Sequence, residues 1–312
     1  MKGNCLIFGG GGFIGSHICD ELIRMGYDVT VFDKQNFSKI NIFHLKDKIR
    51  VIEGDFNNAI DLKRALEGID YVFHLVSSTL PATSNENPVY DAETNLVSTL
   101  RLLGELKGSQ KKKIIFISSG GTVYGIPKEI PIPESHTRNP LCSYGIIKKT
   151  IEDYLYMYNY LYGLDYVVLR LSNPYGERQN PLYSQGVIPV FLRKILVGEE
   201  IHIWGDGSVK RDYIYIKDAV SVIAKSVEYS GNSRIFNLGY GEGYTLNEII
   251  KIMETETGKV PVVKYEAGRK LDVPVNVLDI TLAKKTFGWK PKVTFAEGIK
   301  RTHTYIKDIT FL

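Results

Sequence analysis

Apolar residues in the first two-thirds of the chain fall into short continuous runs separated by amphipathic segments. The runs are rich in Val, Ile, Phe and Leu. Continuous runs of this kind are typical of strands that are buried on both faces of a parallel sheet. The pattern therefore predicts strands at Cys5–Phe8, Asp28–Phe32, Arg50–Ile52, Tyr71–Leu75, Ile114–Ile117 and Tyr166–Leu169.

The segments between these strands have the spacing of amphipathic helices. Within Phe13–Met25, the apolar residues Ile14, Ile18 and Leu22 recur at helical spacing, and Gly26 ends the helix. Strands that alternate with helices predict an α/β fold, a doubly wound parallel sheet of the Rossmann type with helices on both faces. Further helices are predicted at Asp61–Leu66, Asn95–Lys107 and Ser143–Tyr162.

The pattern changes after about Ser172, where Pro and Gly residues cluster. The segments beyond it predict a smaller C-terminal α/β lobe with a strand pair, an amphipathic helix and an extended stretch. We expect the first domain to span 1–172 with a contribution from about 209–238, and the smaller lobe to span 173–208 and 239–312. The predicted elements of the lobe are Ile201–Trp204 with Asp212–Ile216, Leu246–Glu256 and Pro261–Tyr265.

Composition narrows the class of protein. With 312 residues, 44% hydrophobic and 24% charged, the chain can bury a large core without a disulfide or metal staple. The net charge of +4 is too balanced to indicate a nucleic-acid-binding surface. The chain shows neither a secretory signal nor an apolar run of ~20 residues that would span a membrane. Cys5, Cys19 and Cys142 are odd in number and lack metal-ligand spacing, which favours the cytoplasm and predicts no metal site.

A glycine-rich turn follows the first predicted strand and precedes the first helix. Residues Gly9 to Gly15 fit both Gly-x-Gly-x-x-Gly and Gly-x-x-Gly-x-x-Gly, a turn that lets a pyrophosphate approach the backbone. Asp33 ends the second strand, where a carboxylate accepts the adenosine ribose hydroxyls and repels a 2′-phosphate. The pattern therefore predicts NAD rather than NADP. Asp55 and Phe56, after the third strand, either lie beside the adenine or form a plain loop.

Tyr144 and Lys148 lie four residues apart at the start of a predicted helix, so they project from one face. A phenol is a poor base at neutral pH, but a nearby ammonium and an oxidised nicotinamide favour the phenolate. The pair is suited to take a proton from a hydroxyl while a dinucleotide takes the hydride. Tyr-x-x-x-Lys also arises by chance on solvated helices. The glycine turn, and the preceding strand with Ser118 and Ser119, favour the catalytic interpretation.

Short motifs with a specific resemblance run in order from residue 9 to residue 279. They are GGGGFIG (9–15), FD (32–33), GDF (54–56), FHLVS (73–77), ETNLVST (93–99), SSGGTVYG (118–125), YGIIK (144–148), LRLSNPYG (169–176), VIPVFL (187–192), IHIWGDGSVKRDYIYIKD (201–218) and GRKLDVPVNVLD (268–279). As a set they resemble the extended short-chain dehydrogenase/reductase family, in its nucleotide-sugar epimerase/dehydratase branch, and within it the UDP-hexose 4-epimerases. The resemblance implies bound NAD and a nucleotide-sugar substrate, a UDP-hexose above all.

The resemblance also implies a role for each matching residue. Tyr144 is the acid/base, and Lys148 tunes it and binds the nicotinamide ribose. Arg211 and Arg269 bind the diphosphate, for which planar, permanently charged donors are suited, and Asp272 lies near the nucleoside ribose. The expected cofactor contacts are Gly9, Gly12, Phe13, Ile14, Gly15, Asp33, Lys34, Asp55, Phe56, Leu75, Ser77, Asn95, Ser118, Tyr144 and Lys148. The expected substrate contacts are Ser119, Tyr144, Asn173, Val187, Arg211, Arg269, Asp272 and Asn276.

One departure from the family concerns the hydroxyl that assists the tyrosine. The family places a Ser or Thr four residues before the Tyr of Val-Tyr-Gly, and this chain has Gly120 there. We expect Ser119, or else Thr122, to supply that hydroxyl as a catalytic group. A 4,6-dehydratase also carries an Asp-Glu pair where this chain has Gly121 and Thr122, so dehydration is disfavoured.

The leading interpretation is therefore a 4-epimerase that oxidises C4 and returns the hydride to the other face of the sugar. A 4-ketosugar reductase uses an exchangeable, usually phosphorylated cofactor, against which Asp33 argues. A regulatory protein on the same fold typically lacks the Tyr or the Lys. In the epimerases that the chain resembles, the position of Asn276 gates the pocket near the sugar C2 substituent, and the intermediate size of Asn is compatible with N-acetylated sugars. Tyrosines at alternate positions in Ser143–Tyr162 predict a homodimer through this helix and Asn95–Lys107.

Overall fold

Seven strands form one sheet in the order β10-β6-β5-β4-β1-β2-β3, in a computed structural model that describes residues 2–108, 112–182, 186–269 and 272–310. Strands β3, β2, β1, β4 and β5 pair in parallel, as their uninterrupted apolar runs predict. All six predicted strands are present with slightly shifted ends, and β10 adds one that was not predicted. The strands are β1 Asn4–Phe8, β2 Asp28–Asp33, β3 Ile49–Glu53, β4 Tyr71–His74, β5 Lys113–Ser119, β6 Asp165–Leu171 and β10 Ile235–Leu238.

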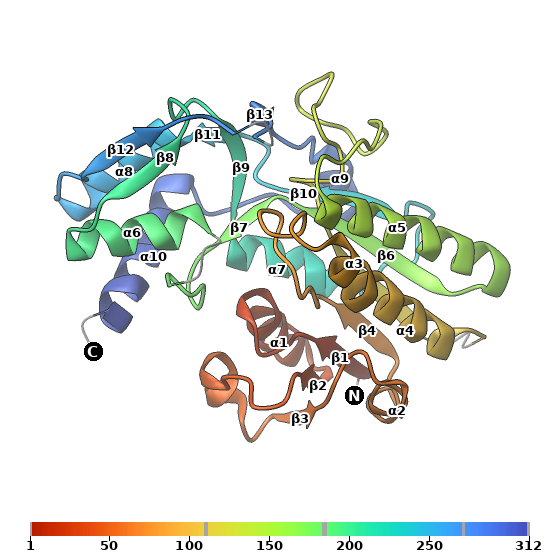
Figure 1. Ribbon diagram of the computed structural model, residues 1–312. Helices are drawn as coiled ribbons and strands as arrows, with labels where there is room; N and C mark the ends of the chain where they lie inside the picture. Colours follow the sequence, from red (N-terminus) through yellow and green to blue (C-terminus); the bar gives the residue numbers. More distant parts are fainter. Residues whose placement is uncertain (1, 109–111, 183–185, 270–271, 311–312) are drawn as a thin grey trace. The chain divides into compact units, whose positions relative to one another are not determined.

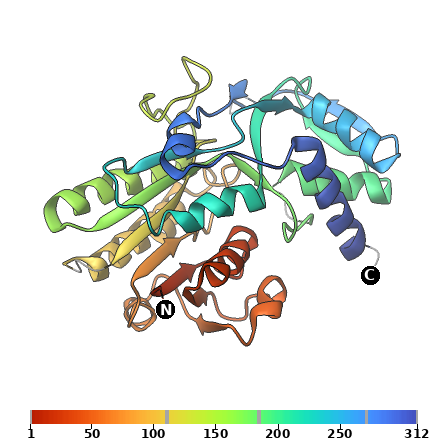
Figure 2. The ribbon, with the colours of Figure 1, turned by 180° about the vertical axis from the view of Figure 1, so that it is seen from behind.

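Helices cover both faces of this sheet (Figures 1 and 2). Helix α1 packs against β1 and β2, while α2, α4 and α5 lie side by side on the other face. The core on that side joins Leu6 and Phe8 of the sheet to Leu102 and Leu155 of the helices, all fully buried. The doubly wound Rossmann-type fold is thereby confirmed. The helices are α1 Phe13–Met25, α2 Ala59–Ala65, α3 Pro88–Asp91, α4 Ser98–Leu106 and α5 Ser143–Tyr162, with a 3-10 helix at Ile40–Leu45.

The helix predicted over Asn95–Lys107 differs from the one observed. A π-helical segment, Ala92–Val97, joins α3 to α4, so the helical stretch begins at Pro88. Asn87 caps its start by accepting a hydrogen bond from the backbone N–H of Tyr90. π-helical segments inside helices are frequent at functional sites, and this one carries Asn95, an expected cofactor contact.

The chain divides into two compact units, each built from three segments. Unit 1 comprises 1–123, 138–170 and 220–236, and unit 2 comprises 124–137, 171–219 and 237–312. The expected division into 1–172 with about 209–238, and 173–208 with 239–312, differs from these exchange points at 124–137 and 209–219, and it stays a prediction. The exchange points fall close to β6 and β10 and inside α7, Ile216–Lys225.

Unit 2 is a smaller α/β arrangement in which β9 is the central strand. Strands β11 and β13 flank β9, and β7 pairs with it in parallel. Both strands predicted between 201 and 216 are present as β8 and β9, but the prediction that they pair with each other is wrong. β8 pairs instead with β12, which lies far along the chain. Helices α6, α8 and α10 pack on one another. The elements are β7 Asn173–Tyr175, β8 Ile201–Trp204, β9 Lys210–Tyr215, β11 Gly243–Thr245, β12 Val263–Glu266, β13 Val275–Asn276, α6 Val187–Val197, α8 Leu246–Thr257, α9 Thr281–Phe287 and α10 Phe295–Thr310.

Candidate active site

The glycine turn of unit 1 connects β1 to α1 with no room for side chains. A Cβ added at Gly15 would lie 2.3 Å from the carbonyl oxygen of Gly9, so the helix approaches the turn too closely for any other residue. Gly9 itself has a φ of 82°, a left-handed conformation that favours glycine. No side chain caps the N-terminus of α1, and its first turn, which begins with Phe13 and Ile14, has no acidic residue. This end of α1 is therefore suited to bind a pyrophosphate.

Asp33 lies directly against this turn. Its Oδ2 accepts a hydrogen bond from the Gly11 N–H at 3.0 Å, and its Oδ1 accepts one from the Lys34 N–H at 2.9 Å. Burial raises the pKa of the Asp33 carboxyl, and these two backbone donors act in the opposite direction. The structure thus brings the carboxylate to the glycine turn, an arrangement that fits the adenosine ribose of NAD. The Lys34 side chain is exposed.

The remaining expected cofactor contacts near this turn differ in their surroundings. Leu75 is half-buried, and its Cβ would lie 3.7 Å from a Cβ on Gly9. Ser77 and Asp55 are exposed. The Phe56 ring is buried, 5.1 Å from the Phe8 ring centroid, so it is a core side chain. The contact of Phe56 with the adenine stays a prediction.

Tyr144 and Lys148 lie in the first two turns of α5, as their spacing predicts. Lys148 is buried, and its Nζ donates a hydrogen bond to the carbonyl oxygen of Ile117 at 3.0 Å. The same Nζ lies 5.5 Å from the Tyr144 ring centroid and 4.8 Å from that of Phe116. Burial lowers the pKa of Lys148 to about 8, while Asp91 and Glu152 act to raise it. The ammonium is thereby held beside the phenol.

The electrostatics of Tyr144 differ from the expectation. Burial raises the pKa of its phenol, and Cys142 and Asp91 add to that rise. The groups of the chain itself therefore keep Tyr144 protonated, since desolvation outweighs the neighbouring ammonium. The positive charge of an oxidised nicotinamide would act in the opposite direction.

The hydroxyl groups near Tyr144 have distinct environments. Ser118 is buried and donates to Oε1 of Glu152 at 2.5 Å, so its side chain is engaged away from the turn. Ser119 is half-buried. Thr122 Oγ1 is buried without a hydrogen-bond partner among the described residues. A buried hydroxyl of this kind normally has a partner, so Thr122 and Ser119 both stay candidates for the hydroxyl absent at Gly120.

Asn95 is buried, and its amide binds protein groups. Its Oδ1 accepts the Ser78 N–H at 2.9 Å, and its Nδ2 donates to Asp91 Oδ1 at 2.8 Å. Sequence reasoning missed two buried carboxylates that act on Lys148, Asp91 and Glu152. An acidic residue inside an amphipathic helix ordinarily signals a solvated face, and only the fold shows that both are buried.

Three expected substrate contacts of unit 2 lie on adjacent strands. Arg211 of β9 is in register with Asn276 of β13, and Asn173 of β7 is in register with Tyr213. Asn173 Nδ2 donates to the carbonyl oxygen of Asp212 at 2.9 Å. Burial lowers the pKa of Arg211, with Asp272 opposing the change. Arg211 Nη1 donates hydrogen bonds to the carbonyl oxygens of Lys210 at 3.0 Å and Val273 at 2.5 Å, which hold the guanidinium beside β9.

Arg269 and Asp272 are paired with each other. Arg269 Nε and Nη2 donate to the two carboxylate oxygens of Asp272 at 3.0 and 2.9 Å, and the guanidinium lies 4.8 Å from the Trp204 ring centroid. Arg269 is exposed, so a phosphate can compete for it. Val187 begins α6, which packs on β8 and α10. Val187 therefore lies on α6, whereas Arg211 lies on β9.

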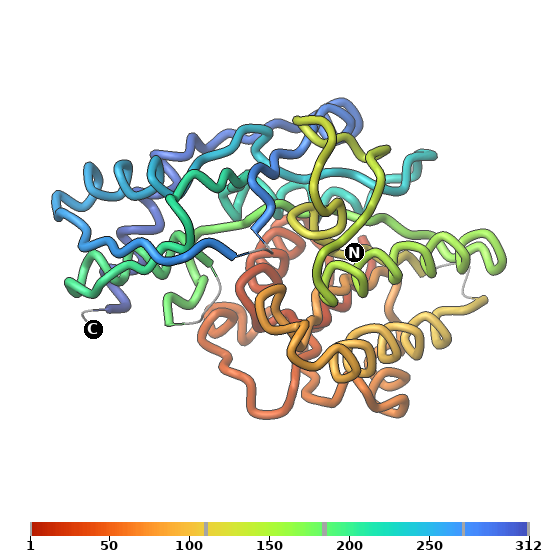
Figure 3. Tube along the Cα trace, turned by 45° about the horizontal axis from the view of Figure 1, so that its top comes forward, coloured from red at the N-terminus to blue at the C-terminus, as the bar shows by residue number. Residues whose placement is uncertain are grey.

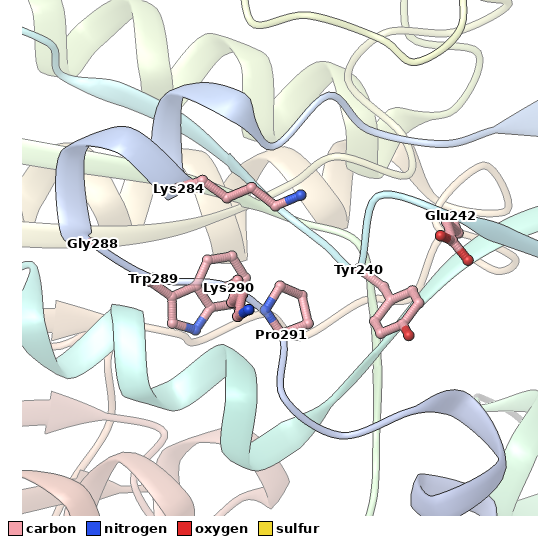
Figure 4. A pocket seen from close by; sticks show the side chains of 7 residues that line it. All are labelled: Tyr240, Glu242, Lys284, Gly288, Trp289, Lys290 and Pro291. Atoms are coloured by element: carbon pink, nitrogen blue, oxygen red, sulfur yellow. The ribbon is translucent and has the colours of Figure 1, made fainter.

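A separate pocket of about 530 Å³ opens on unit 2, and Figure 4 shows its lining side chains. Trp289 lines it and donates a hydrogen bond from Nε1 to the carbonyl oxygen of Asp218 at 3.1 Å. None of the expected substrate contacts lines it. The lining residues are Tyr240, Glu242, Lys284, Gly288, Trp289, Lys290 and Pro291.

Two classes of feature are absent from the described part of the chain. Its His, Cys, Asp and Glu side chains form no group of three or more that could hold a metal ion. Among its helices, none is both long and apolar enough to span a bilayer.

Comparison with known proteins identifies the family. The model of the NAD dependent epimerase/dehydratase family matches residues 5–239. The solved UDP-glucose 4-epimerase of Thermotoga maritima, in complex with UDP-glucose, is 39% identical, with a TM-score of 0.91 over 98% of this chain and 99% of that one. A UDP-N-acetylglucosamine 4-epimerase from Methanobrevibacter ruminantium is 32% identical, with a TM-score of 0.91 over 99% of each chain. The dTDP-4-dehydro-6-deoxyglucose reductase of Escherichia coli is 34% identical over 96% of each chain. The chain belongs to the NAD-dependent epimerase/dehydratase family.

Proposed function

We propose that this protein is an NAD-dependent UDP-hexose 4-epimerase. The observation that carries the proposal is the placement of the Lys148 ammonium, bound to the carbonyl of Ile117, 5.5 Å from the Tyr144 ring. The same unit holds the glycine turn with Asp33 against it, which fits NAD. The similarity to UDP-hexose 4-epimerases over nearly the whole chain supports the same substrate class.

In the proposed reaction Tyr144 removes the proton from the C4 hydroxyl of the sugar and returns it after the sugar has turned over. When bound, NAD supplies a reversible hydride acceptor for C4. Lys148 stabilises the phenolate form of Tyr144 that accepts the C4 proton, and its hydrogen bond to the carbonyl oxygen of Ile117 keeps it in place. Arg211 and Arg269 bind the diphosphate, which anchors the nucleotide while the hexose presents its other face. The overall reaction is redox-neutral.

A second candidate is reduction of an NDP-4-keto-6-deoxy sugar, because the Escherichia coli relative has that activity in its name. Asp33 disfavours it, since a carboxylate repels the 2′-phosphate of NADPH. Dehydration is disfavoured because Gly121 and Thr122 supply no carboxylate beside the reacting sugar. Asn276 is almost fully buried, at 1% exposure, and we propose that its size admits an N-acetyl group at C2.

We also propose a homodimer that forms through α5. Tyr154 and Tyr158 pack on the core, but Tyr156 and Tyr160 are 66% and 79% exposed, with Leu161 beside them at 54%. Exposed aromatic groups on one helix are typical of an interface. A Tyr160→Glu variant that elutes as a monomer would support this, and a wild-type protein that is monomeric at micromolar concentration would contradict it. Cys5, Cys19 and Cys142 form no disulfide bond, which supports a cytoplasmic setting.

The test of the function compares wild type with Tyr144→Phe. The purified protein is incubated with UDP-glucose, with UDP-N-acetylglucosamine, and with a dTDP-4-keto-6-deoxy sugar, each with and without NADPH. We expect 4-epimerisation of a UDP-hexose without consumption of NADPH, and a loss of about 10²- to 10⁴-fold in Tyr144→Phe. Tyr160→Phe, at an exposed site on the same helix, is the matched control. Reduction of the keto sugar alone, with NADPH consumed, would establish the reductase instead.

A further inference from the structure

Asp91 is a fully buried carboxylate that the proposed mechanism does not use. It is the last residue of α3, directly before the π-helical segment. Its Oδ2 accepts a hydrogen bond from Ser143 Oγ at 2.6 Å. Its Oδ1 accepts bonds from Thr79 Oγ1 at 2.6 Å and from Asn95 Nδ2 at 2.8 Å. The carboxylate therefore joins three separate segments: the loop after β4, the π-helical segment, and the residue that immediately precedes Tyr144.

The loop between β4 and α3, residues 77–87, caps the helix that carries Tyr144. The first N–H groups of a helix have no acceptor within it. In α5 two of them are satisfied by this loop: Ser84 Oγ accepts the Tyr144 N–H at 3.1 Å, and Asn85 Oδ1 accepts the Ser143 N–H at 2.8 Å. Figure 3 shows the loop running beside the start of α5. The backbone of Tyr144 is thus held by a non-local cap.

Asp91 and this cap form a closed ring of hydrogen bonds. Asn95 Oδ1 accepts the Ser78 N–H at 2.9 Å, so the amide that Asp91 orients also holds the loop. The loop holds the Tyr144 backbone, and Asp91 holds the side chain of Ser143. If one of these groups is removed, its partners keep buried donors without an acceptor. The free-energy cost of such an unsatisfied donor exceeds the net contribution of an ordinary hydrogen bond.

We propose that Asp91 is a positioning residue for Tyr144, which fixes the first turn of α5 against the loop 77–87 through Ser143 and Asn95. This inference rests on the proposed function for its kinetic consequence. The geometry that supports it is independent of the substrate, because every bond in the ring lies within unit 1.

The charge of Asp91 also acts on both catalytic groups. It raises the pKa of Lys148 and the pKa of Tyr144. The other ionisable groups that face Lys148 are Glu152 on α5 and His74 on β4, and Cys142 also faces Tyr144. Removal of the Asp91 charge is therefore expected to lower the pKa of both catalytic groups together.

Two variants distinguish the effect of Asp91 on the position of Tyr144 from the effect of its negative charge. Ser143→Ala removes one bond of the ring and keeps the carboxylate, whereas Asp91→Asn keeps the shape and removes the charge. In each we expect kcat for UDP-glucose to fall by about 10- to 100-fold with KM within about twofold, because small displacements of a catalytic group are costly. Glu93→Gln removes an exposed carboxylate two residues away and is the matched control, with wild-type kcat.

The pH profile distinguishes positioning by a charged group from a merely structural role. The limbs of this profile report the ionisation of the two catalytic groups, Tyr144 and Lys148. In Asp91→Asn both limbs should move to lower pH, while in Ser143→Ala they should stay in place at a lower plateau. Unmoved limbs in Asp91→Asn, with only a lower plateau, would overturn the electrostatic part of the proposal.

Hydrogen exchange tests the ring without any assay of activity. The amides of residues 78 and 143–144 should exchange at least about tenfold faster in Asp91→Asn than in wild type, and at the wild-type rate in Glu93→Gln. Wild-type exchange together with wild-type kcat in both ring variants would refute the proposal. A wild-type protein without epimerase activity would refute the proposed function instead, and the exchange rates would still decide whether the ring holds Tyr144.

Discussion

The carboxylate of Glu152 attaches α5, the helix of Tyr144, to the central sheet through a buried ion pair. The side chains of Glu152 and Arg170 are only 1% and 2% exposed, and Arg170 Nη2 lies 2.7 Å from Glu152 Oε2. Arg138 Nη1 reaches the same oxygen at 3.0 Å, and Ser118 donates to the other. Glu152→Gln preserves the volume of the side chain and removes the negative charge that faces Arg170.

The expected cost follows from burial. Removing one partner of a buried ion pair costs about 3–5 kcal/mol, because the remaining charge stays in a medium of low polarity. Asp153→Asn removes the carboxylate of the next residue, which pairs with Arg138 and Lys149 but is 46% exposed. Exposed pairs contribute about 0–1 kcal/mol. The two variants should therefore differ by about 3 kcal/mol, a large part of the total stability of a typical domain.

Urea titrations of wild type and both variants, followed by circular dichroism, measure this difference as a shift in midpoint at constant slope. The double variant Glu152→Leu/Arg170→Met removes both charges and should regain most of the loss, since apolar replacement of a buried pair is often neutral. The reasoning is refuted if Glu152→Gln and Asp153→Asn destabilise the protein equally. It is also refuted if the double variant is less stable than Glu152→Gln.

Three further predictions concern binding of the cofactor, the loss of folding stability at acid pH, and binding of the substrate. Gly15→Ala places a Cβ against the Gly9 carbonyl, and the purified variant should carry less than about a tenth of the wild-type NAD. Gly104→Ala, where a Cβ meets nothing within 4 Å, should carry as much NAD as wild type, and equal loss in both would contradict the steric argument. Burial lowers the pKa of His74 to about 3, below the ~6.5 of an unfolded chain. The unfolded state therefore binds more protons as the pH falls, and wild type should lose about 1 kcal/mol more than His74→Gln between pH 6.5 and 5.5 in urea titrations. Equal losses of stability in wild type and His74→Gln would show that His74 does not cause the pH dependence. Arg211→Lys keeps the charge but loses the planar donors, and should raise KM for a UDP-hexose about tenfold in steady-state kinetics. An unchanged KM would place the diphosphate elsewhere.

Local chemistry accounts for the parts of the fold that were predicted well. Helices α1 and α5 have the bounds read from the sequence because glycine ends each of them, Gly26 and Gly163, both in the left-handed conformation. The glycine turn and the Tyr144–Lys148 pair are local patterns as well. Both depend on the spacing of residues within one turn or one helix, so they can be recognised in a single sequence.

Non-local pairing accounts for the parts that were missed. The identity of β10 as a strand depends on its partner β6, and β8 pairs with β12, some sixty residues further along the chain. An aromatic residue after a strand is compatible with a core or a ligand site, and only the packing on Phe8 places Phe56 in the core. Asp91 resembles an ordinary helix acid until its three partners are brought together by the fold.

The edge strand β10 has a consequence for synthesis of the chain on the ribosome. It pairs with β6, and the Val168 and Ser172 N–H groups bond to the carbonyl oxygens of Arg234 and Leu238. Until residue 238 has emerged, β6 is an open edge whose polar backbone groups are available to other nascent chains. We therefore expect the nascent chain to be prone to aggregation while residues 172–238 are synthesised, and a chaperone that shields this edge to raise the yield of folded product.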